Sequence, residues 1–287
     1  MHTPSPLRRS LGLACLAWLA GAAPARVAEL KPKTVEAWER HVALTEERIE
    51  RELASGRGFL VQDFFGEPAG ERCRAEASQG KVCIVEMQAS SETVEVPGGL
   101  IHHWMGSIFV PGANLESLLA WVKDYDEHHR FFDEVEASRL IARDGERFEM
   151  FLRLKRTKIL TLHYNTTPEV MYRRHSPSRA SSMSRTTRIA ELENAGQADE
   201  REKTPGEERG FLWRLNSYWR FEEREGGVAV SCESLSLSRG LPFGVGWLIK
   251  GYIKSVPRES MEATLVGLRE GYAKSRTAAS QASDPRP

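Results

Sequence analysis

The sequence has no net charge, because its 40 Lys and Arg residues balance its 40 Asp and Glu residues. A chain without excess positive charge lacks the long-range attraction that draws proteins to nucleic acid or to anionic membranes. Long runs of Lys and Arg, which are typical of nucleic-acid-binding segments, are also missing. We therefore expect no nucleic-acid partner.

Motifs that bind metals or nucleotides are absent as well. The chain contains no Cys-x-x-Cys or His-Glu-x-x-His pair, no phosphate-binding loop, no dinucleotide fingerprint and no Gly-x-Ser-x-Gly nucleophile elbow. Its eight histidines are scattered, whereas a zinc site needs three or four converging ligands. The sequence predicts neither a metal nor another cofactor, and no motif assigns a catalytic residue.

The longest apolar run lies at the N-terminus. Arg8 and Arg9 precede the run Leu11–Ala20, and the small residues Ala23-Pro24-Ala25 follow it. This is the layout of a secretory signal peptide, and the run is too short to span a bilayer. We expect residues 1–25 to be removed during export to the periplasm or the medium, and no later segment predicts a transmembrane helix.

Cysteine is scarce, with three residues left after cleavage. An exported protein can form disulfides, and a hairpin around Gln79-Gly80 would bring Cys73 and Cys83 together. The sequence is equally compatible with a Cys73–Cys83 disulfide and with two free thiols at these positions. Cys232 shares strand parity with Val230, which predicts a small buried hydrophobe rather than a nucleophile.

Residues 26–95 are expected to form an N-terminal extension made of a helix and a hairpin. Apolar residues at helical spacing predict an amphipathic helix over Thr34–Leu53. Strand-like sequence at Gly58–Phe65 and Lys81–Gln88 predicts the hairpin. The extension either packs on the main domain or forms a mobile arm.

The order of elements in residues 96–275 predicts an α+β fold. An apolar strand, Gly99–Val110, leads into an amphipathic helix, Asn114–Phe132. Strand-like segments follow, and an amphipathic helical stretch, Phe243–Tyr272, closes the domain. This order predicts a curved antiparallel sheet around a long C-terminal helix. A disordered tail is expected at 276–287.

Three local signals refine this prediction. Asn114 is a good N-cap for the helix that follows it. The apolar parity changes between Cys232 and Leu235, which predicts a β-bulge near Glu233. Proline removes one helical hydrogen bond, so a kink or break is expected at Ser255–Pro257.

The chain resembles the START-like superfamily, which includes lipid transfer domains and polyketide cyclase/dehydrase-like proteins. The resemblance is carried by Gly106–Pro111, Trp121–Tyr125, Val135–Arg143, Trp219–Glu223, Gly226–Val230, Glu233–Ser236, Leu241-Pro242 and Pro257–Met261. It covers roughly the last two-thirds of the chain and implies a helix-grip fold with a ligand cavity between the sheet and the closing helix. The N-terminal extension and the charged loop Glu193–Gly210 depart from a minimal domain of this kind.

Alternation in Phe211–Glu223 divides the strand into two faces. The apolar face, which includes Trp213, Leu215 and Trp219, is the better core face. The opposite face, with Arg214 and its neighbours, is either a solvated surface or a polar patch of the cavity, and we favour the solvated surface. The predicted ligand-binding residues are Trp213, Leu215, Trp219, Ile253, Met261, Leu265 and Leu268, with Arg214, Asn216 and His163 as polar contacts.

The leading hypothesis is an exported protein that binds or carries a hydrophobic small molecule or lipid. A second is a polyketide cyclase/dehydrase-like enzyme that uses the same cavity, which requires an inward-facing acid or base. A third is a non-catalytic interaction module whose own side chains fill the cavity; the sequence names no protein partner. The acid/base candidates are His102 or His103, Asp124, His163 and Glu233.

Overall fold

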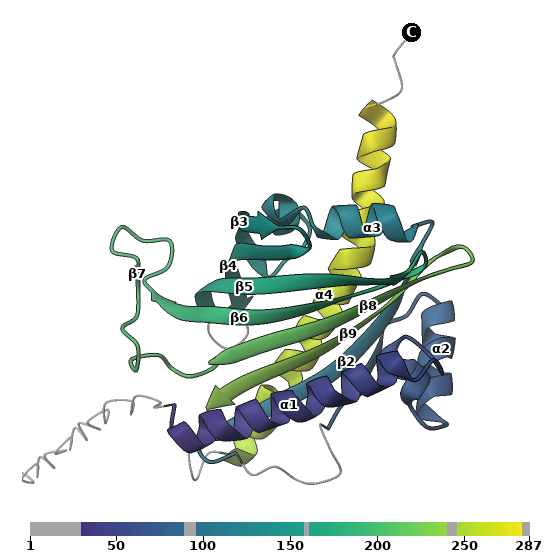
Figure 1. The fold of residues 1–287 in the computed structure, drawn as a ribbon. Helices are drawn as coiled ribbons and strands as arrows, with labels where there is room; N and C mark the ends of the chain where they lie inside the picture. Colours follow the sequence, from purple (N-terminus) through teal and green to yellow (C-terminus); the bar gives the residue numbers. More distant parts are fainter. Residues whose placement is uncertain (1–29, 89–95, 158–160, 240–245, 283–287) are drawn as a thin grey trace, which may run out of the picture.

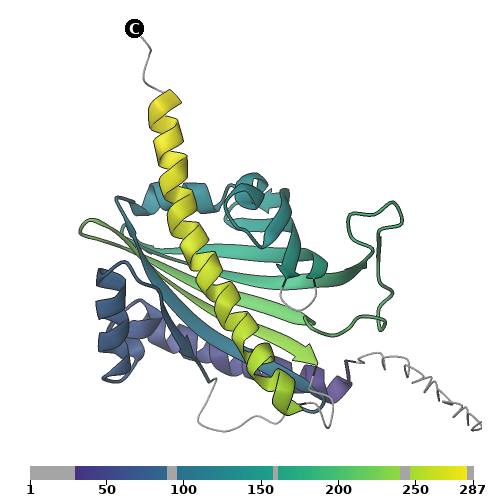
Figure 2. The ribbon, with the colours of Figure 1, turned by 180° about the vertical axis from the view of Figure 1, so that it is seen from behind.

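The chain folds into three layers, with a central sheet covered by one long helix on each face (Figures 1 and 2). The computed structural model describes residues 30–88, 96–157, 161–239 and 246–282. The predicted signal peptide lies outside these residues. One helix of the N-terminal extension lies across the front of the sheet in Figure 1, and the C-terminal helix crosses its back.

The sheet has nine strands in the order β1-β2-β9-β8-β6-β5-β4-β3, with β7 paired to β6. Every pair is antiparallel. The strands are β1 (Cys83–Glu86), β2 (Gly99–Pro111), β3 (Val135–Asp144), β4 (Arg147–Thr157), β5 (Thr161–Ser176), β6 (Arg179–Glu193), β7 (Arg201–Glu202), β8 (Arg214–Arg224) and β9 (Gly227–Arg239).

The helices surround this sheet. They are α1 (Pro32–Ala54), α2 (Ala69–Ser78), α3 (Leu115–Val122) and α4 (Gly246–Ala282), with 3-10 helices η1 (Val61–Phe64) and η2 (Tyr125–Arg130). An open antiparallel sheet with a long C-terminal helix across one face is the helix-grip fold, so the predicted fold class is confirmed.

The N-terminal extension differs from the predicted hairpin. Gly58–Phe65 contains η1 rather than a strand, and α2 follows it. Phe59, Leu60 and Val61 are buried in succession, whereas a half-exposed strand would bury every second residue. The second predicted strand exists as β1, but it pairs with β2 as the edge of the main sheet.

A disulfide connects this extension internally. Cys73 on α2 and Cys83 on β1 are bonded, and both are fully buried. The bridge closes a loop that contains the C-terminal half of α2, so α2 is tied to the edge strand of the sheet. Of the two readings that the sequence left open, the structure has the bridge, while Cys232 is a buried free thiol, as predicted.

The helix α1 packs tightly on the sheet and is not a mobile arm. Trp38 and Ile49 form one apolar cluster with Leu235 and Leu237 of β9. Arg220 of β8 reaches across to Glu52 of α1 at 2.5 Å. Both faces of the central strands are therefore covered, one by α1 and the other by α4.

This double cover explains the parity change in β9. Cys232 belongs to the cluster that includes Leu265 of α4, whereas Leu235 belongs to the cluster of α1. The register of β9 with β2 and β8 runs through Glu233 without a shift. The predicted bulge near Glu233 is therefore wrong: the apolar residues change sides because each end of the strand meets a different helix.

The C-terminal helix crosses the sheet as one continuous helix. Pro257 lies inside α4, so the predicted break there is wrong. Proline removes only one hydrogen bond, and Met261 and Leu265 pack so closely on Gly106 that an added Cβ would lie 2.8 and 2.5 Å from them. The helix continues to Ala282, into the region predicted as a disordered tail. No helix among the described residues is long and apolar enough to cross a membrane.

The start of α3 provides a test of local structure. The Asn114 side chain accepts a hydrogen bond from the backbone N–H of Ser117 at 2.8 Å, which confirms it as the N-cap. We expect Asn114→Ala to lower the free energy of unfolding by about 1 kcal/mol in urea titrations, because one helix N–H loses its acceptor. Asn114→Asp keeps the acceptor and should retain stability; equal losses in both variants would contradict this role.

Candidate functional site

The two faces of the central strands have different surroundings. We call the face against α1 the α1 side and the face against α4 the α4 side. Leu235 marks the α1 side, and Phe221 and Cys232 mark the α4 side. Side chains alternate between the faces along each strand, and residues paired across strands share a face. The register therefore assigns every residue of β8 and β9 to one side.

The α1 side is sealed. Tyr218 and Arg220 of β8 are 4% and 1% exposed, and Glu233 and Leu235 of β9 are both 0% exposed. The polar members are paired with α1: Tyr218 donates to Glu46 at 2.8 Å, and Arg220 donates to Glu52. No accessible surface remains at these positions for a ligand.

The α4 side is more open in the same central strands. Ser217 and Trp219 of β8 and Ser234 and Ser236 of β9 are only half-buried, although their strands lie inside the sheet. Trp104 of β2, the partner of Ser234, is half-buried too. An accessible surface of aromatic and hydroxyl groups therefore lies on the α4 side of the sheet.

Aromatic rings form one part of this surface. The Trp219 and Phe221 rings are stacked, with centroids 6.1 Å apart and planes within 10° of each other. The Trp219 Nε1 donates to the Ser217 hydroxyl at 3.2 Å. This bond fixes the indole on the sheet and leaves its ring face available for apolar contact.

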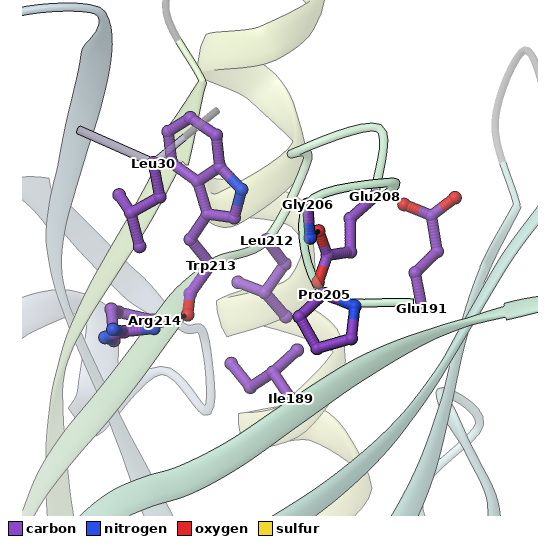
Figure 3. A pocket seen from close by; sticks show the side chains of 9 residues that line it. All are labelled: Leu30, Ile189, Glu191, Pro205, Gly206, Glu208, Leu212, Trp213 and Arg214. Atoms are coloured by element: carbon purple, nitrogen blue, oxygen red, sulfur yellow. Dashed lines mark hydrogen bonds between the residues drawn. The ribbon is translucent and has the colours of Figure 1, made fainter. Parts of the chain in front are cut away.

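A pocket lies where two strands of the sheet separate (Figure 3). Pairing between β6 and β8 ends at Arg185 and Asn216, and beyond this point the pocket opens with a volume of about 310 Å³. This volume is at the lower end of the range for small-molecule sites. It is lined by Leu30, Ile189, Glu191, Pro205, Gly206, Glu208, Leu212, Trp213 and Arg214.

The acidic group at the back of this pocket is already paired. Glu191 is 1% exposed, and its carboxylate accepts from Lys203 Nζ and from the Arg209 backbone N–H, both at 2.8 Å. A register shift between β5 and β6 at Thr167 and Pro168 turns Ile189 and Glu191 to the α4 side. The pocket is therefore bordered by α4-side residues of β6 and by Leu30 and Trp213 from the cluster of α1, and Glu191 mainly holds the 203–209 loop.

A buried polar chain lies on the opposite side, beneath α1. His103 Nε2 is 2.6 Å from Glu233 Oε1, and His103 Nδ1 is 3.0 Å from His41 Nε2. Arg48 also pairs with Glu233. Burial would raise the pKa of Glu233, but the His103 hydrogen bond and the charges of His103 and Arg48 lower it. Burial, reinforced by His103, lowers the pKa of His41 to about 4.

The structure brings half of the predicted ligand-binding residues together. Leu215 and Trp219 lie on the α4 side by register with Ser236 and Cys232. Met261, Leu265 and Leu268 of α4 pack in the cluster on that side. The side chain of Ile253 lies outside the described residues.

Four predicted residues lie elsewhere. Trp213 packs in the cluster of α1, and Asn216 is buried on the α1 side. Arg214 lies at the pocket, where its guanidinium donates to the carbonyl of Trp213. His163 pairs with Glu136 at 2.7 Å, away from α4. The face of Arg214 and Asn216 is therefore neither a solvated surface nor part of the α4 side.

The acid/base candidates are also separated. His103 and Glu233 lie beneath α1, and Asp124 is exposed next to η2. His102 alone among the candidates lies on the α4 side, where its Nε2 is 3.0 Å from the Ser238 hydroxyl. The structure thus leaves one candidate acid or base on the accessible side of the sheet.

Sequence reasoning missed the serines of the α4 side. Ser182 and Ser184 alternate in β6, and Ser234, Ser236 and Ser238 alternate in β9. Hydroxyls at every second position of a central strand are the signal that could have found them, because alternation places them all on one face.

The comparisons with known proteins agree with the fold and reach no further. No protein-family model matches the sequence, and no curated protein matches it. Among solved structures, human StAR-related lipid transfer protein 5 has 12% identity and a TM-score of 0.47, over 85% of this chain and 99% of that one. A STAR-related lipid transfer protein from Xanthomonas axonopodis has 14% identity and a TM-score of 0.43, over 63% and 97%.

A third similar structure is the Zhui aromatase/cyclase from Streptomyces, with 10% identity and a TM-score of 0.42, over 61% of this chain and 95% of that one. The fold of this chain is shown by its own sheet order and by α4. At these identities the activities of those proteins do not transfer to this chain.

Proposed function

We propose that the protein is exported and binds or carries a hydrophobic small molecule or lipid on the α4 side of its sheet. The observation that carries the proposal is the difference between the two faces of β8. Tyr218 and Arg220 on the α1 side are sealed, whereas Ser217 and Trp219 on the α4 side are half-buried.

Burial of apolar surface would drive this binding. Removing apolar area from water contributes roughly 25 cal/mol per Å², and the accessible groups include Trp104, Leu215 and Trp219. Concave sites lined by apolar and aromatic groups with a few polar ones are typical for small molecules. An interaction module with a self-filled interior would instead bury these side chains completely.

Two features support export. The sequence begins with the layout of a signal peptide. The Cys73–Cys83 disulfide is the kind of bond that persists in oxidising compartments and is rare in the cytosol. We expect the mature protein to begin near Arg26, which the intact mass of protein collected from its producing cells will test.

Native mass spectrometry of that protein tests binding directly. We expect added mass from a bound hydrophobic molecule, and uptake of a fluorescent sterol or fatty-acid probe by the delipidated protein. Ser217→Leu places a larger side chain on the α4 side and should reduce uptake. Ser181→Leu changes β6 on the opposite side and should not. Repeated preparations without bound lipid, together with no uptake of either probe, would refute the proposal.

A second candidate is a polyketide cyclase/dehydrase-like enzyme, which the position of His102 favours. His102 lies on the α4 side with a hydrogen-bond partner in Ser238, so it is placed to act on a molecule bound there. His102→Gln should then abolish turnover of a poly-keto substrate and retain its binding. If the unmodified protein binds the poly-keto substrate without turnover, the enzyme candidate is refuted and only the carrier function remains.

A further inference from the structure

We propose that the ligand is uncharged and carries hydroxyl, ester or keto oxygens, and that a row of serines on the α4 side recognises these oxygens. This inference rests on the proposed function and specifies the chemical class of its ligand. The row consists of Ser184 on β6, Ser217 on β8 and Ser234 on β9, and we call it the serine row.

The serine row crosses three neighbouring strands. Ser184 pairs with Ser217, and Ser217 pairs with Ser234, in unbroken register. Neighbouring strands lie about 4.8 Å apart, so the three hydroxyls span about 10 Å. Trp104 continues the row on β2, and Trp219 lies two residues beyond Ser217. The backbone of the sheet therefore holds a line of hydroxyls that ends at the Trp104 indole and has the Trp219 indole beside Ser217.

The hydroxyls of the row are available for a ligand. Within the described part of the chain, the Oγ atoms of Ser184 and Ser234 have no hydrogen-bond partner, and Ser217 Oγ accepts only from Trp219. All three residues are half-buried rather than exposed. A hydroxyl can both donate and accept a hydrogen bond. A hydrogen bond from a half-buried hydroxyl to a ligand oxygen, in place of water, contributes modestly to the binding free energy.

Within the described strands β2, β6, β8 and β9, the α4 side carries no Lys or Arg and no unpaired carboxylate for an ionic head group. By register, the charged residues on this side of those strands are Glu191, Glu193 and Glu223. Glu191 pairs with Lys203, Glu193 pairs with Arg201, and Glu223 accepts from the Leu115 backbone N–H at 2.7 Å. Transferring an unpaired carboxylate or phosphate to such a surface is costly. A neutral ligand oxygen needs only one hydrogen-bond donor, which a single serine hydroxyl supplies.

The chemistry therefore favours a neutral, oxygen-bearing lipid, such as a long-chain alcohol, a glyceride or a sterol, over a fatty acid or a phospholipid. Ser236 and His102 form the next row towards the end of the sheet. They extend the hydrogen-bonding surface in the direction of the pocket, where the Glu191 carboxylate is paired with Lys203 and the Arg214 guanidinium donates to the Trp213 carbonyl.

A matched set of probes tests this inference on the delipidated, full mature chain. Monoacylglycerol, the free fatty acid and the alkane of equal chain length are compared by displacement of a fluorescent sterol. We expect monoacylglycerol to bind at least about 10-fold more tightly than the fatty acid at pH 8. In Ser217→Ala/Ser234→Ala, monoacylglycerol affinity should fall about 10-fold, as expected for two modest hydrogen bonds, with alkane affinity unchanged.

Ser181→Ala is the control, because Ser181 lies on β6 on the opposite side and bonds His175 at 2.8 Å. It should change neither affinity. Tighter binding of the fatty acid, or an equal loss of alkane and monoacylglycerol affinity in the double variant, would overturn this inference and leave the proposed function standing. If no probe of any class binds, the proposed function fails as well.

Discussion

Arg220→Ala is expected to lower the free energy of unfolding by about 3–5 kcal/mol, because it breaks a buried ion pair. The side chain is 1% exposed. It donates to Glu52 at 2.5 Å and to the Phe59 carbonyl at 3.1 Å. Its removal leaves a buried carbonyl without a donor and takes one cation away from Glu52. Urea unfolding of the oxidised protein measures the change.

Two further variants make this test specific. Arg224→Ala, on the same strand, removes a cation that is 42% exposed and pairs with Glu222, and should cost less than about 1 kcal/mol. Arg220→Met combined with Glu52→Leu removes both charges and should recover much of the stability. A loss below about 1 kcal/mol in Arg220→Ala would show that α1 does not depend on this pair.

Acidification from pH 7 to pH 4 is expected to destabilise the fold by about 3 kcal/mol through His41 alone. Burial, followed by the charge of His103, lowers the pKa of His41 from its ordinary 6.5 to about 4. The unfolded chain therefore binds a proton over this range and the folded chain does not. This contribution to stability is complete above pH 6.5 and is lost as the pH falls towards 4.

His41→Gln isolates this contribution. The variant keeps a polar side chain next to His103 but cannot take up the proton, so its stability should depend less on pH between 6.5 and 4. His129→Gln, at an exposed position, should follow the unmodified protein. Unfolding in urea at pH 7, 5.5 and 4.5 provides the comparison. Identical pH profiles for His41→Gln and the unmodified protein would contradict this role of His41.

Much of the fold was readable from local signals. The Asp144-Gly145 turn lies between β3 and β4, and Gly145 has a φ of +55°, which glycine adopts without strain. Asn114 caps α3 through its own side chain. Such features depend on a few neighbouring residues, so the sequence alone is sufficient to predict them.

The sides of the strands were harder to predict. Alternation separates Trp219 from Arg220, and it predicted correctly that they lie on opposite faces. It also suggested that the face of Arg220 is solvated. That prediction failed because α1, some 170 residues earlier in the chain, brings Glu46 and Glu52 to this face and pairs its polar groups. A cover supplied by a distant helix leaves no local trace in the strand.

The candidate site was predicted only in part for the same reason. Leu215, Trp219 and Leu265 lie on the α4 side as predicted, since they follow from parity and helical spacing. Trp213 shares their parity but packs against α1, because the pairing of β6 with β8 has already ended and the strand start is free to turn.

Within residues 96–275, the sequence by itself determined the order of strands and helices and the alternation of side chains between the two faces of each strand. These features depend on local spacing and backbone geometry. Only the tertiary structure decided which face of each strand is sealed and which remains accessible. The physical reason is that a strand presents two surfaces, and the helix that covers each one comes from a different end of the chain.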